Sequence, residues 1–447
     1  MKRIHQLILS GLAGVLVATG CRGFATSGEK TARKDLAAVS SQLQTNLPAL
    51  TTNATLLNAV YFAVQNNPQV IAAYADWEAS VENITIARSL PDPKLTFQAY
   101  LQDSLTSLMP GLMTDIPGFG KRDARAVAAT VEGRAKYFQF ANAVQQTAFE
   151  LQKSYYPLHF LDAKLSVNRQ TLALLAELEA LARAQNEVGQ STLQDVLNAQ
   201  IEQRKLQTET TNLEDSRNLM LAQYKAALGL RPGQADPPVP AEPDFSDRKL
   251  DDEKLLADAL KENPHLKELE AEILAAEANI QVARKEKMPD FSAGLQAEVY
   301  EPPLYWPQAS ISLPIWRDKL AADRAAADAG VRGARARLTA GQISLAVDFA
   351  GQSYLVREAD RELALLRESL LPRARLALEI ARAAYRSSRV DFLNLIDDER
   401  SLLNFQLDEI AAQTQREIAR SELTLLVAGV PPENAPLLKP KTSMTGR

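Results

Sequence analysis

The sequence predicts a mainly α protein with a small β part, in which one structural unit is written twice. The 447-residue chain is rich in Ala, Leu, Glu, Gln and Arg and contains only 19 Gly and 13 Phe, a composition that favours helices. Long helical stretches recur in the same order in both halves of the chain. In each half they are interrupted by short segments in which apolar and polar residues alternate, as in strands with two different faces.

The N-terminus has the pattern of an export signal. Lys2 and Arg3 precede the mostly apolar run Leu7–Val17, and small residues follow. This run is too short to span a membrane, and no later stretch reaches the roughly 18 apolar residues that a spanning helix needs. We therefore expect residues 1–20 to be a signal peptide and the mature chain to be exported.

Cys21 is the only cysteine in the chain, so it cannot form an internal disulfide. Its position after a signal-like run, preceded by Ala18, Thr19 and Gly20, resembles a bacterial lipobox, in which the thiol is acylated and the cysteine becomes the new N-terminus. Arg22 follows, rather than the Asp that commonly retains lipoproteins at the inner membrane, and this favours anchoring in the outer membrane. An ordinary signal peptide with an incidental Cys is the alternative.

The duplicated unit can be followed over about 180 residues at a nearly constant spacing. An Asn-Pro pair at 67–68 recurs at 263–264, and the segment VGQSTLQDVL from Val188 corresponds to SSRVDFLNLI from Ser387. The predicted organisation is a signal peptide (1–20), a lipid-anchored N-terminal segment (21–53), a first repeat (54–230), a Pro-rich acidic linker (231–252), a second repeat (253–430) and a C-terminal tail (431–447).

Each repeat is predicted to follow the same order of elements. A short helix ends at the Asn-Pro pair, because the residue before Pro is disfavoured in a helix, and the Pro opens a helix of about 22 residues. After the alternating segment come a very long helix, near 121–187 and 318–386, a turn and a returning helix of about 36 residues. The long helix would span roughly 100 Å, so we expect an elongated protomer whose apolar stripes need neighbours. Pro157 should kink or interrupt the first long helix.

The alternating segments at 94–118 and 290–315 predict four strands. Their length suits a bilayer, because tilted membrane-spanning strands need roughly 9–11 residues, and the alternation suits a barrel with a lipid-facing and a lumen-facing side. Four strands leave open edges, which are very costly in hydrocarbon, so the barrel would have to close by oligomerisation. The candidate lipid-facing residues are Leu95, Phe97, Leu101, Leu295, Val299 and Ile311.

In the order and spacing of several motifs the chain resembles the TolC/OprM-like outer-membrane efflux channels, and within them the lipoprotein branch. The motifs are the duplicated Asn-Pro helix start, ARSLPDP and ARKEKMPD before the strands, IPGFGKR and LPIWRDK before the long helices, and VGQSTLQDVLNAQ at the first helical turn. The resemblance covers nearly the whole mature chain. It implies a homotrimer, in which three chains form a twelve-stranded β-barrel in the outer membrane on top of a periplasmic α-helical barrel.

The resemblance also implies function and partners. The trimer would be a passive exit duct for drugs or metal ions, which an inner-membrane efflux pump, usually proton-driven, delivers through a periplasmic adaptor (membrane fusion) protein. The chain fits a passive role, since it has no Walker-type phosphate loop. Its charge, −5 in total, is well mixed, so no basic patch indicates nucleic acid. Adaptor tips are expected to dock on the helical turns, at Val188, Gly189, Gln190, Ser387 and Ser388.

In this family, acidic side chains of the second helical turn form a ring at the periplasmic entrance. The matching segment here is VDFLNLIDDER, in which Asn394 and Asp397 occupy the two usual acidic positions, and the Asn argues against a strong double ring. Like charges from three chains would raise the local cation concentration. The entrance candidates, including two arginines that would form closing salt bridges, are Asp397, Asp391, Asp195, Asn394, Asp398, Arg389 and Arg400. Alternatively these acids are solvated or cap helix ends, as Asp391 would.

The sequence does not predict an enzyme. His5, His159 and His265 are far apart, no metal-type spacing such as HExxH occurs, and no motif supports Ser/His/Asp chemistry. No metal or cofactor is predicted, apart from the covalent lipid on Cys21. The remaining alternative is a soluble periplasmic coiled-coil scaffold or adaptor lipoprotein, with the strands as half-buried hairpins. However, a scaffold would not need alternating strands at matching points of both halves, and an adaptor has one helical hairpin with Gly-rich β-domains.

Overall fold

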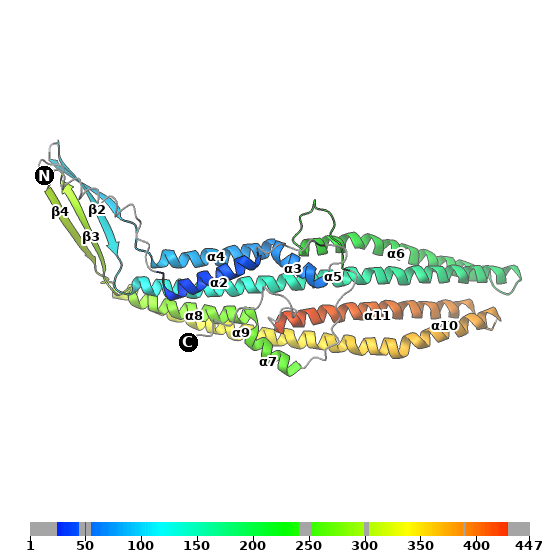
Figure 1. Ribbon diagram of the computed structural model, residues 1–447. Coiled ribbons are helices and arrows are strands. Elements are labelled where there is room, and N and C mark those ends of the chain that lie inside the picture. The colour runs from blue at the N-terminus through cyan, green and yellow to red at the C-terminus, as the bar shows by residue number, and fades with distance from the viewer. Residues whose placement is uncertain are drawn as a thin grey trace. The chain divides into compact units, whose positions relative to one another are not determined.

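The computed structural model describes residues 25–427 except 44–49, 51–54, 103, 241–251, 299–303 and 388. The predicted signal peptide, Cys21 and the predicted tail therefore lie outside the described residues. The described chain is mainly helical, as predicted, and its strands are confined to two segments (Figure 1). Within the described ranges, no helix combines the length and the apolar character that a membrane crossing requires.

The elements follow one another in two series of the same order, preceded by α2 (Ser27–Leu43). The first series consists of α3 (Leu56–Asn66), α4 (Pro68–Arg88), β1 (Lys94–Gln102), β2 (Ser104–Ile116), α5 (Lys121–Glu187) and α6 (Leu193–Ala227). The second consists of α7 (Asp252–Glu262), α8 (Pro264–Lys285), β3 (Asp290–Glu298), β4 (Leu304–Ser312), α9 (Arg317–Leu365), the π-helical turn η1 (Leu366–Leu370), α10 (Leu371–Arg386) and α11 (Phe392–Val427).

The chain divides into two compact parts, and α2, α4, α5, α8 and α9 contribute to both. We call the first part the strand unit; it consists of the described residues of Met1–Ala38, Trp77–Arg134 and Ala271–Ala334. The second part, the helical unit, consists of the described residues of Val39–Asp76, Ala135–Glu270 and Arg335–Arg447.

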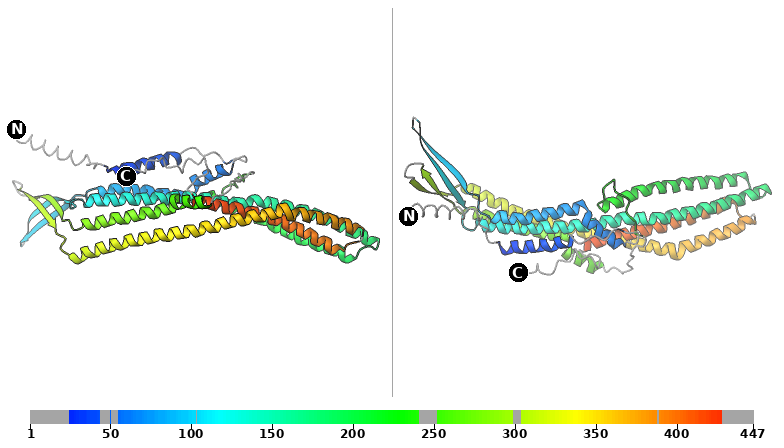
Figure 2. Two further views of the ribbon diagram at one scale, coloured as in Figure 1. Left: turned by 90° about the horizontal axis from the view of Figure 1, so that it is seen from below. Right: turned by 45° about the horizontal axis from the view of Figure 1, so that its top comes forward.

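The strand unit contains one antiparallel sheet in the order β1-β2-β3-β4 (Figure 2). Strands β2 and β3 pair with each other, with Leu112 opposite Leu295, and so join the two halves of the chain. The outer edges of β1 and β4 have no strand partner among the described residues. Pro307 lies in the edge strand β4 opposite Leu295, and Pro110 lies opposite Phe97, one residue beyond the β2–β3 pairing.

Helix α2 is attached to α4 in the strand unit through Glu29, which is only 1% exposed. Its carboxylate accepts hydrogen bonds from Arg88, from the Thr85 hydroxyl (2.7 Å) and from Arg33 (3.2 Å). The hydrogen bond from Arg88 contributes most to lowering the pKa of Glu29 to about 2. Arg33 extends this network with two hydrogen bonds to Glu82, of 2.6 and 2.7 Å.

The duplicated Asn-Pro pair makes the same contacts in both halves of the helical unit. The Oδ1 of Asn67 accepts a hydrogen bond from the N–H of Gln69 (2.8 Å), which caps α4, and its Nδ2 donates to the carbonyl of Ala227 at the end of α6 (3.5 Å). Asn263 caps α8 in the same way, and its Nδ2 donates to the carbonyl of Leu426 in α11 (3.0 Å). Each pair therefore ends one helix, starts the next and fastens the returning helix.

The interruption expected at Pro157 does not occur, because α5 continues through it as a helix. A proline inside a helix removes one hydrogen bond and crowds the preceding turn. Its neighbours Tyr155, Tyr156 and Leu158 are all buried, and the Tyr155 hydroxyl donates to the carbonyl of Pro240 (3.0 Å). This packing and the hydrogen bond of Tyr155 offset the loss of the helix hydrogen bond at Pro157.

The second long helix, expected to be continuous over 318–386, is divided by η1. There the N–H of Leu371 donates to the carbonyl of Leu366, five residues earlier. The next residue, Pro372, has no N–H to continue the regular i to i−4 ladder. A single π-helical turn is one way in which a helix accommodates such a break.

Candidate functional site

The first helical turn, between α5 and α6, is closed by a hydrogen-bond pattern that depends on Gly189. Its N–H donates to the carbonyl of Asn186 (3.0 Å). The N–H of Gln190 donates to the carbonyl of Gln185 (2.8 Å), and the two bonds together form a Schellman motif. Gly189 has a φ of 76°, in the left-handed region that favours glycine. Like Gly189, Val188 and Gln190 are exposed.

Asp195 acts as a helix cap in this turn. Its carboxylate accepts a hydrogen bond from the backbone N–H of Thr192 at 3.3 Å, as in a capping box. The side chain is therefore engaged at the start of α6, which is the contact that the capping alternative predicts.

The second turn, between α10 and α11, begins at Ser387, whose hydroxyl donates to the carbonyl of Ala384 (3.0 Å). The backbone N–H of Arg389 donates to the same carbonyl (2.9 Å), while its exposed side chain forms no ion pair with any described residue. Asp391 is exposed and directly precedes α11, in the position where carboxylates cap helices. Ser388 lies outside the described residues.

Both turns lie at the same end of the helical unit (Figures 1 and 2), and a shared hydrophobic cluster packs the helices beside them. The buried members of this tip cluster are Leu175, Leu178, Ala182, Val196, Ala199, Leu206, Leu378, Ala381, Tyr385, Phe392, Leu395 and Ile396. In addition, the Nε2 of Gln185 donates a buried hydrogen bond to the backbone carbonyl of Tyr385 (3.0 Å). The end of the first hairpin is thereby fixed to the end of the second.

The first turns of α11 have two distinct faces. Phe392, Leu395 and Ile396 are buried in the tip cluster. The opposite face presents Asp391, Asn394 and Asp397, all exposed, with Asp398 half-buried beside them. Spacings of three residues place these side chains on one side of a helix, so the structure brings most of the predicted entrance residues together.

Arg400 connects the two halves through an acid that the sequence does not predict. Its Nη2 and Nε donate to the carboxylate of Glu202 on α6, at 2.5 and 3.1 Å, and its Nη1 donates to Asp397 at 3.2 Å. The hydrogen bonds from Arg400 lower the pKa of Glu202. No sequence signal distinguishes Glu202 from the other acids of α6, because this contact depends on how two distant helices pack.

Glu399 is a second acid that the sequence analysis does not single out, and it is buried, with only 2% of its surface exposed. Desolvation raises its pKa to about 7, and the Glu202 carboxylate acts in the same direction, whereas Thr171 and Arg382 favour the ionised form. Glu399 stands seven residues after the buried Phe392. A spacing of seven residues places Glu399 on the same face of α11 as Phe392, so this spacing was the sequence signal that Glu399 is buried.

In the strand unit, apolar residues of the sheet form one exposed face. Leu95, Leu112 and Leu295 are direct cross-strand neighbours, so their side chains point to the same side of the sheet. They are 65%, 51% and 52% exposed. Phe97 and Ile311 lie on the same face by strand alternation and are similarly exposed, at 65% and 59%.

The other face of the sheet carries polar contacts. Gln296, only 4% exposed, donates to the carbonyl of Met109 (3.4 Å) and accepts a hydrogen bond from Gln308. The two sides of the sheet therefore differ in the way that the alternation predicts. Of the remaining lipid-facing candidates, Leu101 belongs to β1 but its side chain lies outside the described residues, as does the whole of Val299.

The described residues contain no group of three or more His, Cys, Asp or Glu side chains placed to hold a metal ion. Two histidines have contacts of their own: His159 stacks on Tyr155, with 5.6 Å between the ring centroids, and the ring of His265 lies 3.4 Å from Glu268.

A family model described as "Outer membrane efflux protein" matches residues 59–230 and 255–429, well over half of the chain. The two matched stretches correspond to the two series of elements. No curated protein matches the sequence.

Several solved structures share the fold at low sequence identity. A membrane protein from Pseudomonas aeruginosa is 21% identical, with a TM-score of 0.73 over 83% of this chain and 90% of that one. The outer membrane protein VceC from Vibrio cholerae is 19% identical, with a TM-score of 0.69 over 83% and 94%. The open state of the MtrE outer membrane channel from Neisseria gonorrhoeae is 17% identical, with a TM-score of 0.71 over 86% and 94%.

Proposed function

Because the chain belongs to the outer membrane efflux protein family, we propose that three copies of this outer-membrane channel close a twelve-stranded β-barrel above a periplasmic α-helical barrel. The observation that carries the proposal is the four-stranded sheet with an exposed apolar face and two open edges. Lipid stabilises such a face but does not hydrogen-bond the edges, so each sheet needs neighbours on both sides. Sheets from neighbouring copies supply these partners.

Exposed apolar stripes on the helices support the same assembly. On α6, Leu193, Leu197 and Ile201 follow one another at four-residue intervals and are 63%, 49% and 50% exposed. On α9, Ile343 and Val347 are 61% and 66% exposed at the same interval. Regular apolar stripes of this kind are buried against other helices, and neighbouring protomers of a helical barrel would provide them.

In this assembly the channel is a passive exit duct. An inner-membrane pump, usually proton-driven in this family, delivers drugs or metal ions through a periplasmic adaptor. The adaptor docks on Val188, Gly189, Gln190, Ser387 and Ser388. The rigid backbone of the first turn and the tip cluster behind it would give the adaptor a fixed surface to recognise.

The exposed face of α11 would line the periplasmic entrance. Three copies of Asp391, Asn394 and Asp397 would form a ring that attracts cations, with Asp398 and Asp195 beside it. Arg400 would restrict the entrance, because its bonds to Glu202 hold α11 against α6 and its bond to Asp397, on α11 itself, engages one of the entrance carboxylates.

We also propose that the N-terminal signal, residues 1–20, is removed and that acylated Cys21 anchors the chain in the outer membrane. The segment 21–53 then leads to the first repeat at 54–230, and the linker 231–252 joins it to the second repeat at 253–430, which is followed by the tail 431–447. The attachment of α2 through Glu29 fits an anchored N-terminal segment that is held to the strand unit.

Single-channel recording in a planar bilayer tests the proposal. The purified full chain should form discrete pores, and Cys21→Ser should do so as well and should still need detergent. A double variant, Leu95→Asp with Leu295→Asp, should lose pore formation, because two charges on the lipid face cost several kcal/mol in a bilayer. A Cys21→Ser protein that is stable in water without detergent and forms no pores would favour the soluble scaffold instead.

A further inference from the structure

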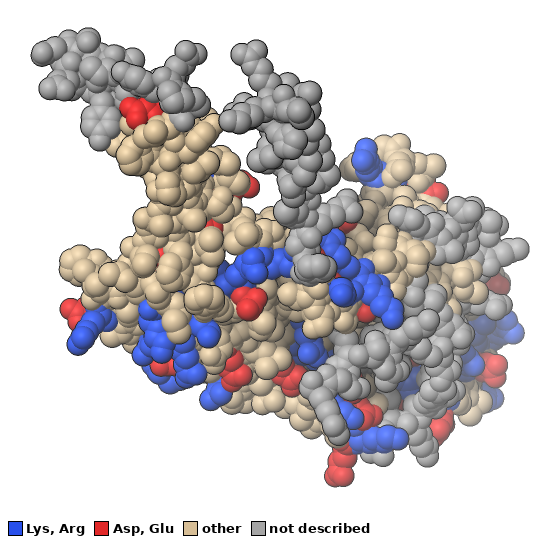
Figure 3. All heavy atoms as spheres, turned by 60° about the vertical axis from the view of Figure 1, so that its left-hand side comes forward, with Lys and Arg blue, Asp and Glu red and all other residues tan. Residues whose placement is uncertain are grey.

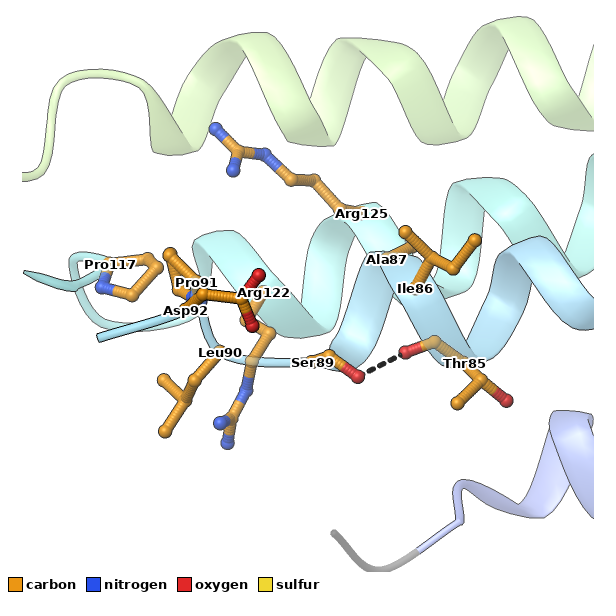
Figure 4. A pocket seen from close by; sticks show the side chains of 10 residues that line it. All are labelled: Thr85, Ile86, Ala87, Ser89, Leu90, Pro91, Asp92, Pro117, Arg122 and Arg125. Atoms are coloured by element: carbon orange, nitrogen blue, oxygen red, sulfur yellow. Dashed lines mark hydrogen bonds between the residues drawn. The ribbon is translucent and has the colours of Figure 1, made fainter. Parts of the chain in front are cut away.

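The strand unit has a cavity of about 450 Å³ where α4 leads into β1 and β2 leads into α5 (Figure 4). This volume lies in the range of ordinary ligand pockets. Its lining includes four chemically distinct groups: the cations Arg122 and Arg125, the carboxylate of Asp92, the hydroxyl of Ser89 and the apolar side chain of Leu90.

Two opposite charges in this cavity have no partner among the described residues. Arg125 is balanced by Glu286, which lies 2.9 Å away. Arg122 and Asp92 form neither an ion pair nor a side-chain hydrogen bond with any residue that the structure describes, and they do not pair with each other. In Figure 4 the guanidinium of Arg122 extends beside Leu90, apart from the carboxylate of Asp92. The cavity therefore offers one cationic and one separate anionic contact.

The hydroxyl of Ser89 adds a hydrogen-bond acceptor. Its proton is donated to the backbone carbonyl of Thr85 (2.6 Å), the bond drawn as a dashed line in Figure 4. The oxygen can then offer only its lone pairs to a ligand. A hydroxyl acceptor and a free carboxylate in the lining of one cavity suit a primary ammonium group, which has three donors.

The position of the cavity along the strands matches the headgroup layer of a bilayer. Asp92 lies two residues before Lys94, the first residue of β1, and Pro117 directly follows the last residue of β2. Two extended residues span about 7 Å, and the headgroup layer on each side of the hydrocarbon is roughly 5–8 Å thick. Leu90 and Ile86 are 48% and 70% exposed. Figure 3 shows several further Lys and Arg side chains, with Asp and Glu among them, on the face of the molecule that is turned forward in that view.

We propose that this cavity binds the headgroup of an aminophospholipid from the leaflet next to the helices. The phosphate binds Arg122, the primary ammonium binds Asp92 and Ser89, and Leu90 contacts the glycerol and the first acyl carbons. The site rests on the proposed function, since a membrane-spanning sheet brings the cavity to this depth. A phosphatidylglycerol headgroup would bind Arg122 but would leave Asp92 without a cation.

The test counts bound lipid on the full chain in detergent by native mass spectrometry. The probes are dihexanoyl phosphatidylethanolamine, dihexanoyl phosphatidylglycerol and inorganic phosphate. Arg122→Ala should weaken the binding of both lipids about fivefold, the effect of one arginine near a phosphate surface, and Arg122→Lys should restore most of it. Asp92→Asn should weaken the binding of the ethanolamine lipid and strengthen the binding of the glycerol lipid. Arg332→Ala, which removes an exposed arginine further along α9, should change neither.

Equal binding of both lipids to the wild type and to all variants would overturn the site. Inorganic phosphate that displaces the lipid at equal concentration would show a plain anion site and overturn the lipid assignment. Pore formation by the same preparations separates this proposal from the channel. If the wild type forms pores but Arg122→Ala binds lipid normally, only the headgroup site fails. If the wild type forms no pores, the channel proposal fails.

Discussion

Arg400 on α11 binds Glu202 on α6 through two hydrogen bonds of 2.5 and 3.1 Å, across 198 positions of sequence. This ion pair ties the returning helix of the second half to that of the first. The buried bond from Gln185 to the Tyr385 carbonyl (3.0 Å) adds a second tie near the turns. Separation of the two helical hairpins therefore requires both contacts to break.

Arg400→Ala should make the channel open more often or more widely, because it releases Glu202 and Asp397 together. The loss of stability should stay within about 1 kcal/mol, since the guanidinium is half-exposed. Single-channel recordings measure the first effect and thermal unfolding measures the second. Arg204→Ala is the matched control, because Arg204 is an exposed α6 arginine that bonds only a neighbouring glutamine. Identical traces for wild type and Arg400→Ala would refute a restricting role.

Glu399→Gln should change how stability depends on pH. Because the folded pKa of Glu399 is raised from 4.5 to about 7, the folded chain binds a proton between these values that the unfolded chain has lost. Stability therefore falls as pH rises through this window and is constant beyond it. The glutamine, which cannot ionise, should raise the free energy of unfolding at pH 8 by an amount on the order of 1–3 kcal/mol relative to wild type, which thermal unfolding detects as a higher midpoint. At pH 4 it should show little advantage.

The control for this prediction is Glu187→Gln, which changes an exposed glutamate at the end of α5. Its pH profile should follow that of the wild type. If wild type and Glu399→Gln lose stability equally between pH 4 and pH 8, the buried carboxylate is not the source of the dependence.

Asp397→Ala should weaken the preference of the open pore for cations, because each trimer would lose three carboxylates from the exposed face of α11. Reversal potentials under a salt gradient measure the preference. Asp408→Ala, an exposed acid three turns further along the same helix, should have a smaller effect. Unchanged selectivity in Asp397→Ala would remove this residue from the entrance.

Two glycine substitutions should differ in cost although both glycines have nearly the same positive φ, 76° for Gly189 and 75° for Gly229. A β-carbon on Gly189 would meet nothing within 4 Å, so Gly189→Ala should cost only the backbone strain, about 1–2 kcal/mol. A β-carbon on Gly229 would lie 2.6 Å from the carbonyl oxygen of Asn66, so Gly229→Ala must also displace backbone and should cost clearly more. Thermal unfolding in detergent ranks the two, and equal midpoints would contradict the structure at Gly229.

Much of the fold could be predicted because proline and glycine mark the ends of its elements. The run IPGFG precedes α5, whose first residue is Lys121, and Gly189 follows its end, so the predicted span 121–187 is the one observed. The pairing of β2 with β3 could not be predicted, since it joins strands from different halves. The π-helical turn η1 was missed, although Pro372 was a readable signal for it.

The site was predicted less completely, because it depends on contacts between distant helices. Asp397 and Asn394 were predicted from the resemblance to the channel family, and helical periodicity places them on one face of α11. Glu202 was not predicted, because which exposed acid meets Arg400 is decided by the packing of α6 against α11. Asp195 is bonded to its own helix start, a local contact that the sequence also allows.

The mass of the detergent-solubilised particle tests the central claim most directly, namely that one chain supplies one third of a closed pore wall. Native mass spectrometry of the full chain should give a particle of three chains with no stable monomer. A folded monomer that persists in water, with Phe97 and Leu295 protected from solvent, would contradict it.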